Sequence, residues 1–179
     1  KTVIIGNSVK TITYGAFQGC SNLTSVIIGN SVTLISNYAF GNCSNLTSII
    51  IPNSIETITY GAFQGCSSLT SIEVEPNNEN YTSFEGILFN KDRTKLILRP
   101  SGKDLSDYTI PNSVTSISDY AFQGCSNLTS VTIPDSVKTI GNRAFWDCKN
   151  LTSITIPNSI ISIGDYVFSP IAVRANVYE

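Results

Sequence analysis

The chain has 179 residues, a net charge of −2 at neutral pH and only 13% charged side chains. This length suits one well-buried domain, and the slightly acidic charge offers no general attraction for nucleic acid or anionic lipid. Histidine is absent, which excludes Ser-His-Asp and Cys-His catalysis as well as metal sites built on imidazole. No run of about 18 apolar residues occurs that could form a membrane-spanning helix.

A repeat of 23 residues organises the sequence, and its clearest copy, AFQGCSNLTSVTI, runs from Ala121 to Ile133. Phenylalanine marks the period in two runs: Phe17, Phe40 and Phe63, then Phe122, Phe145 and Phe168. The 59 residues from Phe63 to Phe122 equal two repeats plus 13 residues. Such a period predicts a solenoid whose stacked repeats share one core. We therefore predict one solenoid domain over residues 1–179, with regular repeats at 1–74 and 109–168, an enlarged repeat at 75–108 and a finishing segment at 169–179.

Polar and apolar residues alternate within each repeat, as in Ser25-Val26-Ile27-Ile28. Alternation with a period of two, bounded by turn residues such as Pro111-Asn112-Ser113, predicts a β-strand. We expect further strands at 48–51, 71–74, 130–133 and 153–156, all in the same direction. Stacking then gives a parallel sheet with strands about 4.8 Å apart.

The rest of each repeat crosses to the other side of the coil, as residues 8–20 illustrate with SVKTITYGAFQGC. Threonine, valine and isoleucine in the first half of this segment predict an extended piece. The Ala-Phe pair in the second half predicts one helical or 3₁₀ turn.

The enlarged repeat contains two apolar runs on either side of residues 90–94, which predicts a β-hairpin with a loop of four or five residues. Basic side chains gather there: Lys91, Arg93, Lys95 and Arg99. They form a candidate patch for a polyanion such as a glycosaminoglycan. Three aspartates dilute its charge, so we favour a solvated hairpin.

All five cysteines occupy the same repeat position: Cys20, Cys43, Cys66, Cys125 and Cys148. Because their number is odd and their spacing follows the repeat, we expect a buried column of free thiols rather than disulfides. Ile171 takes the same position in the last repeat, which suits an apolar slot. The spacing does not resemble a zinc motif, and no neighbouring base activates a thiol.

Outward positions of the predicted strands form two columns. The first holds Ser25, Ser48, Ser71, Ser130 and Ser153, and the second holds Ile4, Ile27, Ile50, Glu73, Thr132 and Thr155. Three stacked isoleucines predict a protein-binding face, although strand propensity alone also places β-branched residues there. Glu73 begins an acidic cluster with Glu75, Glu79 and Glu85. This cluster lacks a diagnostic spacing for calcium or glycoside chemistry, so we interpret it as a solvated face.

The chain opens inside a repeat, without a signal peptide, so we expect a segment of a longer protein whose targeting signals lie outside it. No repeat of this sequence precedes the strand expected at residues 2–5. We therefore predict an exposed edge there through which the protein associates with itself.

The repeat resembles the BspA-type leucine-rich repeat. The residues that carry this resemblance are Ile110 to Val114, Ala121-Phe122, Cys125, Leu128 and Val131. The stretch from Gly86 to Asp92 is similar to the hairpin variant of that family. The resemblance implies a right-handed α/β leucine-rich repeat solenoid with a parallel β-sheet on one face, short strands and helical or 3₁₀ turns on the other, and one enlarged repeat carrying a hairpin.

Because the residues offer no catalytic, metal or cofactor site, we expect a protein that is not an enzyme and needs no metal or cofactor. We expect an adhesion or recognition segment of a bacterial cell-surface or secreted protein that binds a host or microbial protein or glycan through the open sheet face. We expect neither a nucleic-acid partner nor membrane insertion. Two alternatives stay open, namely a structural spacer that displays another domain and a self-assembling repeat segment.

Overall fold

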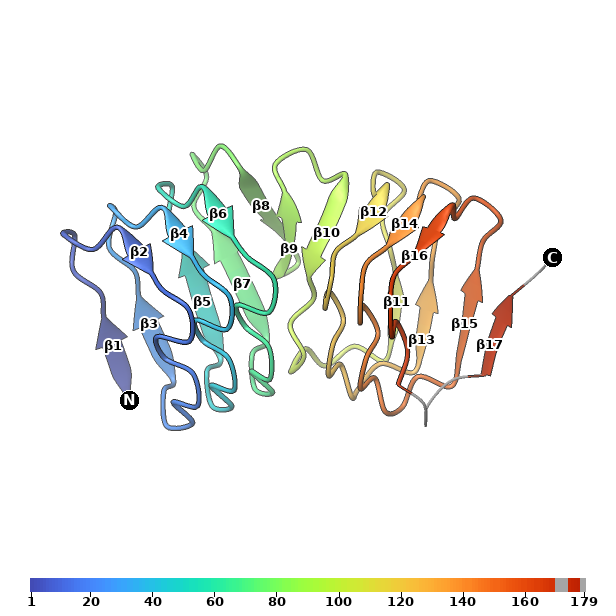
Figure 1. The fold of residues 1–179 in the computed structure, drawn as a ribbon, viewed down its shortest axis with the longest axis horizontal. Coiled ribbons are helices and arrows are strands. Elements are labelled where there is room, and N and C mark those ends of the chain that lie inside the picture. Colours follow the sequence, from blue (N-terminus) through green and yellow to red (C-terminus); the bar gives the residue numbers. More distant parts are fainter. Residues whose placement is uncertain (170–173, 178–179) are drawn as a thin grey trace.

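A computed structural model describes residues 1–169 together with the backbone of residues 174–177. Each repeat forms one turn of a coil with a longer strand on one face and a two-residue strand on another, and the strands β1 and β17 lie at opposite ends of the coil (Figure 1). Ile171, which we expected at the cysteine position of the last repeat, lies outside the described residues. The described residues include no helix long and apolar enough to cross a membrane.

The long-strand face consists of β1 (Thr2–Ile4), β3 (Ser25–Ile27), β5 (Ser48–Ile51), β7 (Ser71–Val74), β11 (Asp107–Thr109), β13 (Ser130–Thr132), β15 (Ser153–Ile156) and β17 (Arg174–Val177). The short-strand face consists of β2 (Thr11–Ile12), β4 (Leu34–Ile35), β6 (Thr57–Ile58), β12 (Ser116–Ile117), β14 (Thr139–Ile140) and β16 (Ser162–Ile163). Strands of successive repeats pair in parallel on both faces, as the partners Ile4 and Ile27 show. The predicted parallel strands are confirmed.

The predicted helical or 3₁₀ turn over the Ala-Phe pair is wrong, because the described residues contain no helix. A 3₁₀ helix needs consecutive amides that bond within the segment. Here alternate amides bond to the next repeat: the Ala16 amide donates to Thr13 O of its own repeat, whereas the Phe17 amide donates to Ala39 O at 2.8 Å. The residue two before each phenylalanine also has a left-handed φ, 60° at Gly15, and this conformation interrupts a right-handed helix.

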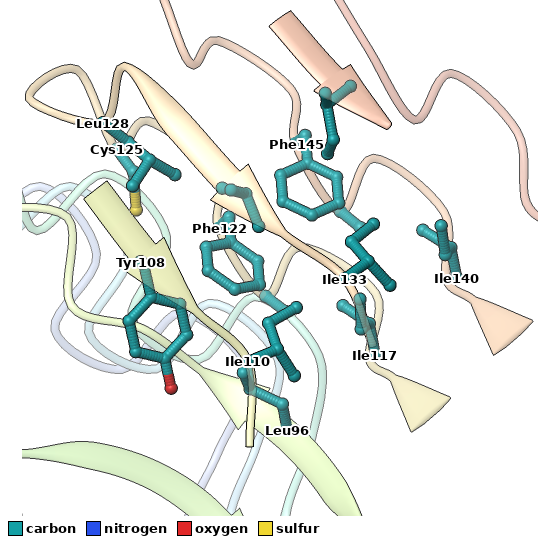
Figure 2. Packing of buried hydrophobic residues seen from close by; sticks show 14 of the residues in the cluster. Leu96, Tyr108, Ile110, Ile117, Phe122, Cys125, Leu128, Ile133, Ile140 and Phe145 are labelled. Atoms are coloured by element: carbon teal, nitrogen blue, oxygen red, sulfur yellow. The ribbon is translucent and has the colours of Figure 1, made fainter. Parts of the chain in front are cut away.

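Stacked phenylalanines run along the interior of the coil. Ring centroids lie 5.3 Å apart for Phe17 and Phe40, and 5.6 Å apart for Phe40 and Phe63. Figure 2 shows the second half of the ladder, where Phe122 and Phe145 stack at 4.7 Å among buried isoleucines. No single repeat can bury such a face, so stability depends on contact between neighbours.

The enlarged repeat forms β8 (Tyr81–Phe84), β9 (Ile87–Asn90) and β10 (Lys95–Leu98), which lie between the two halves of the coil (Figure 1). The predicted hairpin, β9 and β10 with residues 91–94 as its loop, is confirmed. A second hairpin, β8 and β9, turns at Glu85 and Gly86, whose φ values of 52° and 72° suit a tight primed turn. Its Glu-Gly pair is a turn signal that the sequence analysis did not use.

Strand β9 separates two hydrophobic cores. Leu88 belongs to the N-terminal cluster, whereas Ile87 and Phe89 belong to the C-terminal one. Because successive side chains of a strand point to opposite faces, one strand can contribute side chains to both cores. β10 then pairs with β12 in parallel and starts the second stack.

The cysteine column contains free thiols, and four of them are buried as predicted. Each buried thiol donates to a backbone carbonyl of the preceding repeat, for example Cys43 Sγ to Phe17 O at 3.2 Å. Cys20 departs from the expectation, since it belongs to the first repeat of the chain and is exposed. Burial raises the pKa of the Cys125 thiol to about 11, and it also raises the pKa of the Cys148 thiol.

This arrangement predicts the pattern of thiol reactivity. At pH 8 a thiol reagent should modify Cys20 quickly, whereas the four buried thiols should react only as the coil opens, since they are covered. The pKa values of Cys66, Cys125 and Cys148 are also raised, whereas the hydrogen bond with Cys66 lowers the pKa of Cys43, which burial alone protects. Spectrophotometric titration should count one fast thiol in the native protein and five after unfolding without reductant. Fewer than five in the unfolded chain would mean that a disulfide exists and would contradict the thiol column.

The phenylalanine ladder predicts a second outcome, in protein stability. Phe40 is fully buried between two rings, so Phe40→Ala should reduce the free energy of unfolding by about 3–5 kcal/mol. Phe17 is only partly buried, and Phe17→Ala should reduce it by less. Urea unfolding followed by circular dichroism measures both variants. Equal losses would show that the ladder does not carry the stability of the coil.

Candidate functional site

The long-strand face exposes three isoleucines in one column. Ile4, Ile27 and Ile50 are 74%, 55% and 58% exposed on β1, β3 and β5. Ile4 lies opposite Ile27 in the strand register, and Ile50 lies opposite the exposed Glu73. Strands β3 and β5 are not paired in one sheet but lie side by side in the coil (Figure 1). The structure therefore brings these four predicted residues together as an apolar column with a carboxylate at one end.

The serine column lies beside the isoleucines. Ser48 and Ser153 are exposed, whereas Ser25, Ser71 and Ser130 are partly buried. Ser25 Oγ lies 2.8 Å from Thr2 Oγ1, and Ser71 Oγ donates to Glu73 Oε1 at 2.6 Å. Hydroxyls next to an apolar column can hydrogen-bond to a partner while the isoleucines are buried against it.

The enlarged repeat interrupts the predicted face after β7. The Ile72 amide donates to Gly86 O at 2.9 Å, and the Val74 amide donates to Ser83 Oγ at 3.1 Å, so the hairpin occupies the edge of β7. Gly86 packs so tightly that a Cβ atom there would lie 2.7 Å from Ser71 Oγ.

As a result, Ser130, Thr132, Ser153 and Thr155 belong to a separate sheet, β11-β13-β15-β17. Thr132 and Thr155 are exposed on that sheet. The predicted single face is therefore two faces, and only the N-terminal one carries the isoleucines.

The predicted basic patch is wrong for Arg99, which is completely buried. Its amide donates to Ala121 O at 2.8 Å, in the way that the Phe17 amide bonds to Ala39, so Arg99 occupies the phenylalanine position of the enlarged repeat. Its Nη2 atom donates to Leu105 O at 2.8 Å, and its Nε atom has no partner. In the sequence, Arg99 lies 23 residues before Phe122, a signal that could have revealed this position.

The other basic side chains of the patch differ in their contacts. The Arg93 guanidinium lies 4.1 Å from the centre of the Phe84 ring, a cation–π contact. The Lys91 ammonium donates to the carbonyls of Asn78 and Pro76. Lys95 is exposed.

A surface ridge of aromatic rings was missed by the sequence analysis. Ring centroids lie 5.7 Å apart for Tyr14 and Tyr38, 6.3 Å for Tyr38 and Tyr60, and 6.0 Å for Tyr60 and Tyr120. The Arg143 guanidinium continues the ridge at 5.9 Å from the Tyr120 ring. Burial and a hydrogen bond to Tyr120 raise the pKa of Tyr38.

The signal for this ridge is present in the sequence. Every regular repeat places a tyrosine or arginine two or three residues before its phenylalanine: Tyr14, Tyr38, Tyr60, Tyr120, Arg143 and Tyr166. Where the tyrosine lies three residues before, glycine follows it and takes the left-handed φ, as Gly61 does at 69°. Elsewhere the tyrosine or arginine itself adopts this conformation, as Tyr38 does at 55°.

A groove of about 950 Å³ opens on the short-strand face between the two halves of the coil. We call it the seam groove. Its lining includes Thr59, Tyr60 and Gln64 from the repeat before the enlarged one, and Ser118, Tyr120 and Gln123 from the repeat after it. Leu98 and Arg99 of the enlarged repeat also contribute. Among the described residues, no cluster of three or more histidine, cysteine, aspartate or glutamate side chains could hold a metal ion.

Stacked repeats joined by parallel strands define a leucine-rich repeat solenoid. The sequence matches the model of the BspA type leucine rich repeat region in six copies, over residues 1–97 and 101–175. The chain therefore belongs to the BspA-type leucine-rich repeat family. No curated protein matches the sequence.

Solved structures share the fold. The pneumococcal vaccine antigen PcpA is 26% identical with a TM-score of 0.84, over 96% of this chain and 48% of that protein. A leucine-rich cell surface protein of Faecalibacterium prausnitzii is 32% identical with a TM-score of 0.80, over 94% of this chain and 51% of that protein. A leucine-rich repeat protein of Eubacterium ventriosum is 27% identical with a TM-score of 0.70, over 98% of this chain and 60% of that protein. The chain thus spans about half the length of the first and second of these.

The contacts of the basic side chains predict weak polyanion binding. Arg99 is buried and Lys91 and Arg93 already contact the protein, so the chain should elute from immobilised heparin below about 0.15 M salt. Chromatography with a salt gradient measures this. If the chain stays bound above that salt concentration and a Lys91→Ala, Arg93→Ala, Lys95→Ala variant does not, the chain has a polyanion site formed by these three residues without Arg99.

Proposed function

We propose that this chain is a non-catalytic adhesion or recognition segment of a bacterial cell-surface or secreted protein. It binds a host or microbial protein or glycan through the N-terminal half of its long-strand face. The observation that carries this proposal is the column of three exposed isoleucines that ends at Glu73. In a chain with only 13% charged residues, such a column is the kind of apolar surface that marks an interface.

The energetics favour binding by this surface. Burying one isoleucine side chain completely contributes about 1.5–3 kcal/mol, so three can supply a large share of a micromolar affinity. The column is built on paired strands whose backbone is already ordered, which reduces the entropy lost on binding. Glu73 adds selectivity, since a partner with a basic side chain near the column gains a charge-assisted hydrogen bond.

The similar proteins support the cellular setting. One is described as a cell surface protein and another as a vaccine antigen. The absence of histidine from the whole sequence supports a role in binding rather than in catalysis.

Self-assembly is a second candidate, because strands of successive repeats pair through backbone hydrogen bonds, as β1 and β3 do, and a strand of a second copy can form bonds of the same kind. Light scattering at high concentration tests this candidate, and a strictly monomeric protein would exclude it.

The proposed face predicts the effect of charged substitutions. Ile27→Lys with Ile50→Lys should weaken binding at least tenfold, because two ammonium groups would have to be desolvated in the interface. Both side chains lie outside the core, so circular dichroism and thermal stability should change little. Surface plasmon resonance against host matrix proteins, mucins and glycans measures the loss.

The matched control is Thr132→Lys with Thr155→Lys, the same column in the C-terminal half of the coil. This control should bind as the unmodified chain does. Equal binding by both variants would move the site away from the isoleucines. Absence of binding to any probe would favour a structural spacer that displays another domain.

A further inference from the structure

The seam groove lies on the short-strand face and plays no part in the proposed function. It forms where the enlarged repeat replaces a regular one, because the hairpin leads away from β6 and β10 joins β12 instead. Its volume of about 950 Å³ falls within the range of roughly 300–1,000 Å³ that small-molecule sites occupy.

The two walls of the groove carry the same pair of side chains. Thr59 and Ser118 precede the phenylalanines of their repeats by four residues, and Gln64 and Gln123 follow those phenylalanines directly. All four line the groove. The repeat therefore presents a hydroxyl and an amide from each side of the gap.

These groups lack partners within the protein. Thr59 Oγ1, Gln64 Oε1, Ser118 Oγ, Gln123 Oε1 and Arg99 Nε are buried atoms without a hydrogen bond, and the described residues contain only two other side chains of this kind. Native proteins pair the large majority of buried polar side-chain atoms, because a buried polar atom without a partner loses its hydrogen bonds to water and gains none in return. Five orphans around one groove indicate a partner that the chain itself does not supply.

The chemistry of the orphans restricts that partner. The glutamine Oε1 atoms only accept hydrogen bonds, so the partner has to donate, whereas the Thr59 and Ser118 hydroxyls can both donate and accept. Tyr60 and Tyr120 stack at 6.0 Å from opposite walls and add apolar ring edges and two phenol hydroxyls. Amphipathic rings of this kind bind ligands with little loss of conformational entropy.

The charges in the lining make an anionic partner unfavourable. Glu56 and Asp119 line the groove as well as Lys95. The Nη2 atom of Arg99 already donates a hydrogen bond to Leu105 O. Such a groove does not suit a phosphate or a polyanion, whereas a neutral polyhydroxyl compound supplies donors, acceptors and apolar C–H surface together.

We propose that the seam groove binds neutral carbohydrate, with sugar hydroxyls donating to Gln64 and Gln123, and Tyr60 and Tyr120 packing at the rim. The two glutamines are only partly buried, and both line the groove. This site is independent of the isoleucine column, and either can exist without the other.

The test uses the whole chain and a panel of neutral tetrasaccharides built from glucose, galactose, mannose and N-acetylglucosamine, with a heparin-derived tetrasaccharide for comparison. Isothermal titration calorimetry should show saturable binding of at least one neutral member and none of the heparin fragment. Gln64→Ala with Gln123→Ala should weaken that binding at least tenfold. Gln18→Ala, the same repeat position outside the groove, should change it less than twofold.

A second variant guards against misfolding. Tyr60 is 52% exposed, so Tyr60→Ala should keep the coil intact and still weaken sugar binding. Ile27→Lys with Ile50→Lys should leave sugar binding unchanged, which separates this site from the long-strand face. The proposal is overturned if no neutral sugar binds, if the double glutamine variant binds as well as the unmodified chain, or if the groove variants lose a protein ligand and no sugar.

Discussion

The structure depends on one constraint, the registration of each repeat on the next. Alternate amides around the Ala-Phe pair bond to the neighbouring repeat, as Phe17 does to Ala39 and Phe40 to Ala62. These bonds align the phenylalanine rings and carry the buried thiols onto carbonyls of the preceding repeat. Because buried backbone groups are costly when unpaired, a slip of one residue would disturb hydrogen bonds and core together.

The enlarged repeat interrupts this register at one place. The features that distinguish this coil from a regular one follow from that interruption. The hairpin crosses between the faces, walls two cores with Leu88 and Phe89 and takes over the edge of β7. The long-strand face is thereby divided, and the short-strand face opens into the seam groove. A single enlarged repeat thus separates two candidate binding surfaces on one coil.

Packing restricts the residue types of the core, whereas the exposed positions are free of this restriction. Phe40, Cys43 and Leu46 are constrained by packing, and their identities vary little from repeat to repeat. Exposed positions such as Ile27, Glu73 and Tyr60 are not constrained in this way, so their side chains can serve recognition. A rigid coil with variable exposed columns is suited to binding without movement of the backbone.

The period, the strand direction, the buried columns and the hairpin around residues 91–94 could be predicted from the sequence, because each follows from local alternation and from contacts one repeat away. The sequence also predicted that Ile4, Ile27 and Ile50 point outward, since alternation fixes which side chains a strand exposes. Three features became evident only in the folded chain: the Ala-Phe segment is not helical, Arg99 is buried, and the Tyr60 and Tyr120 rings stack. The conformation of the Ala-Phe segment depends on hydrogen bonds to the next repeat. The positions of Arg99, Tyr60 and Tyr120 depend on how the chain folds around the insertion, and a regular spacing does not encode this.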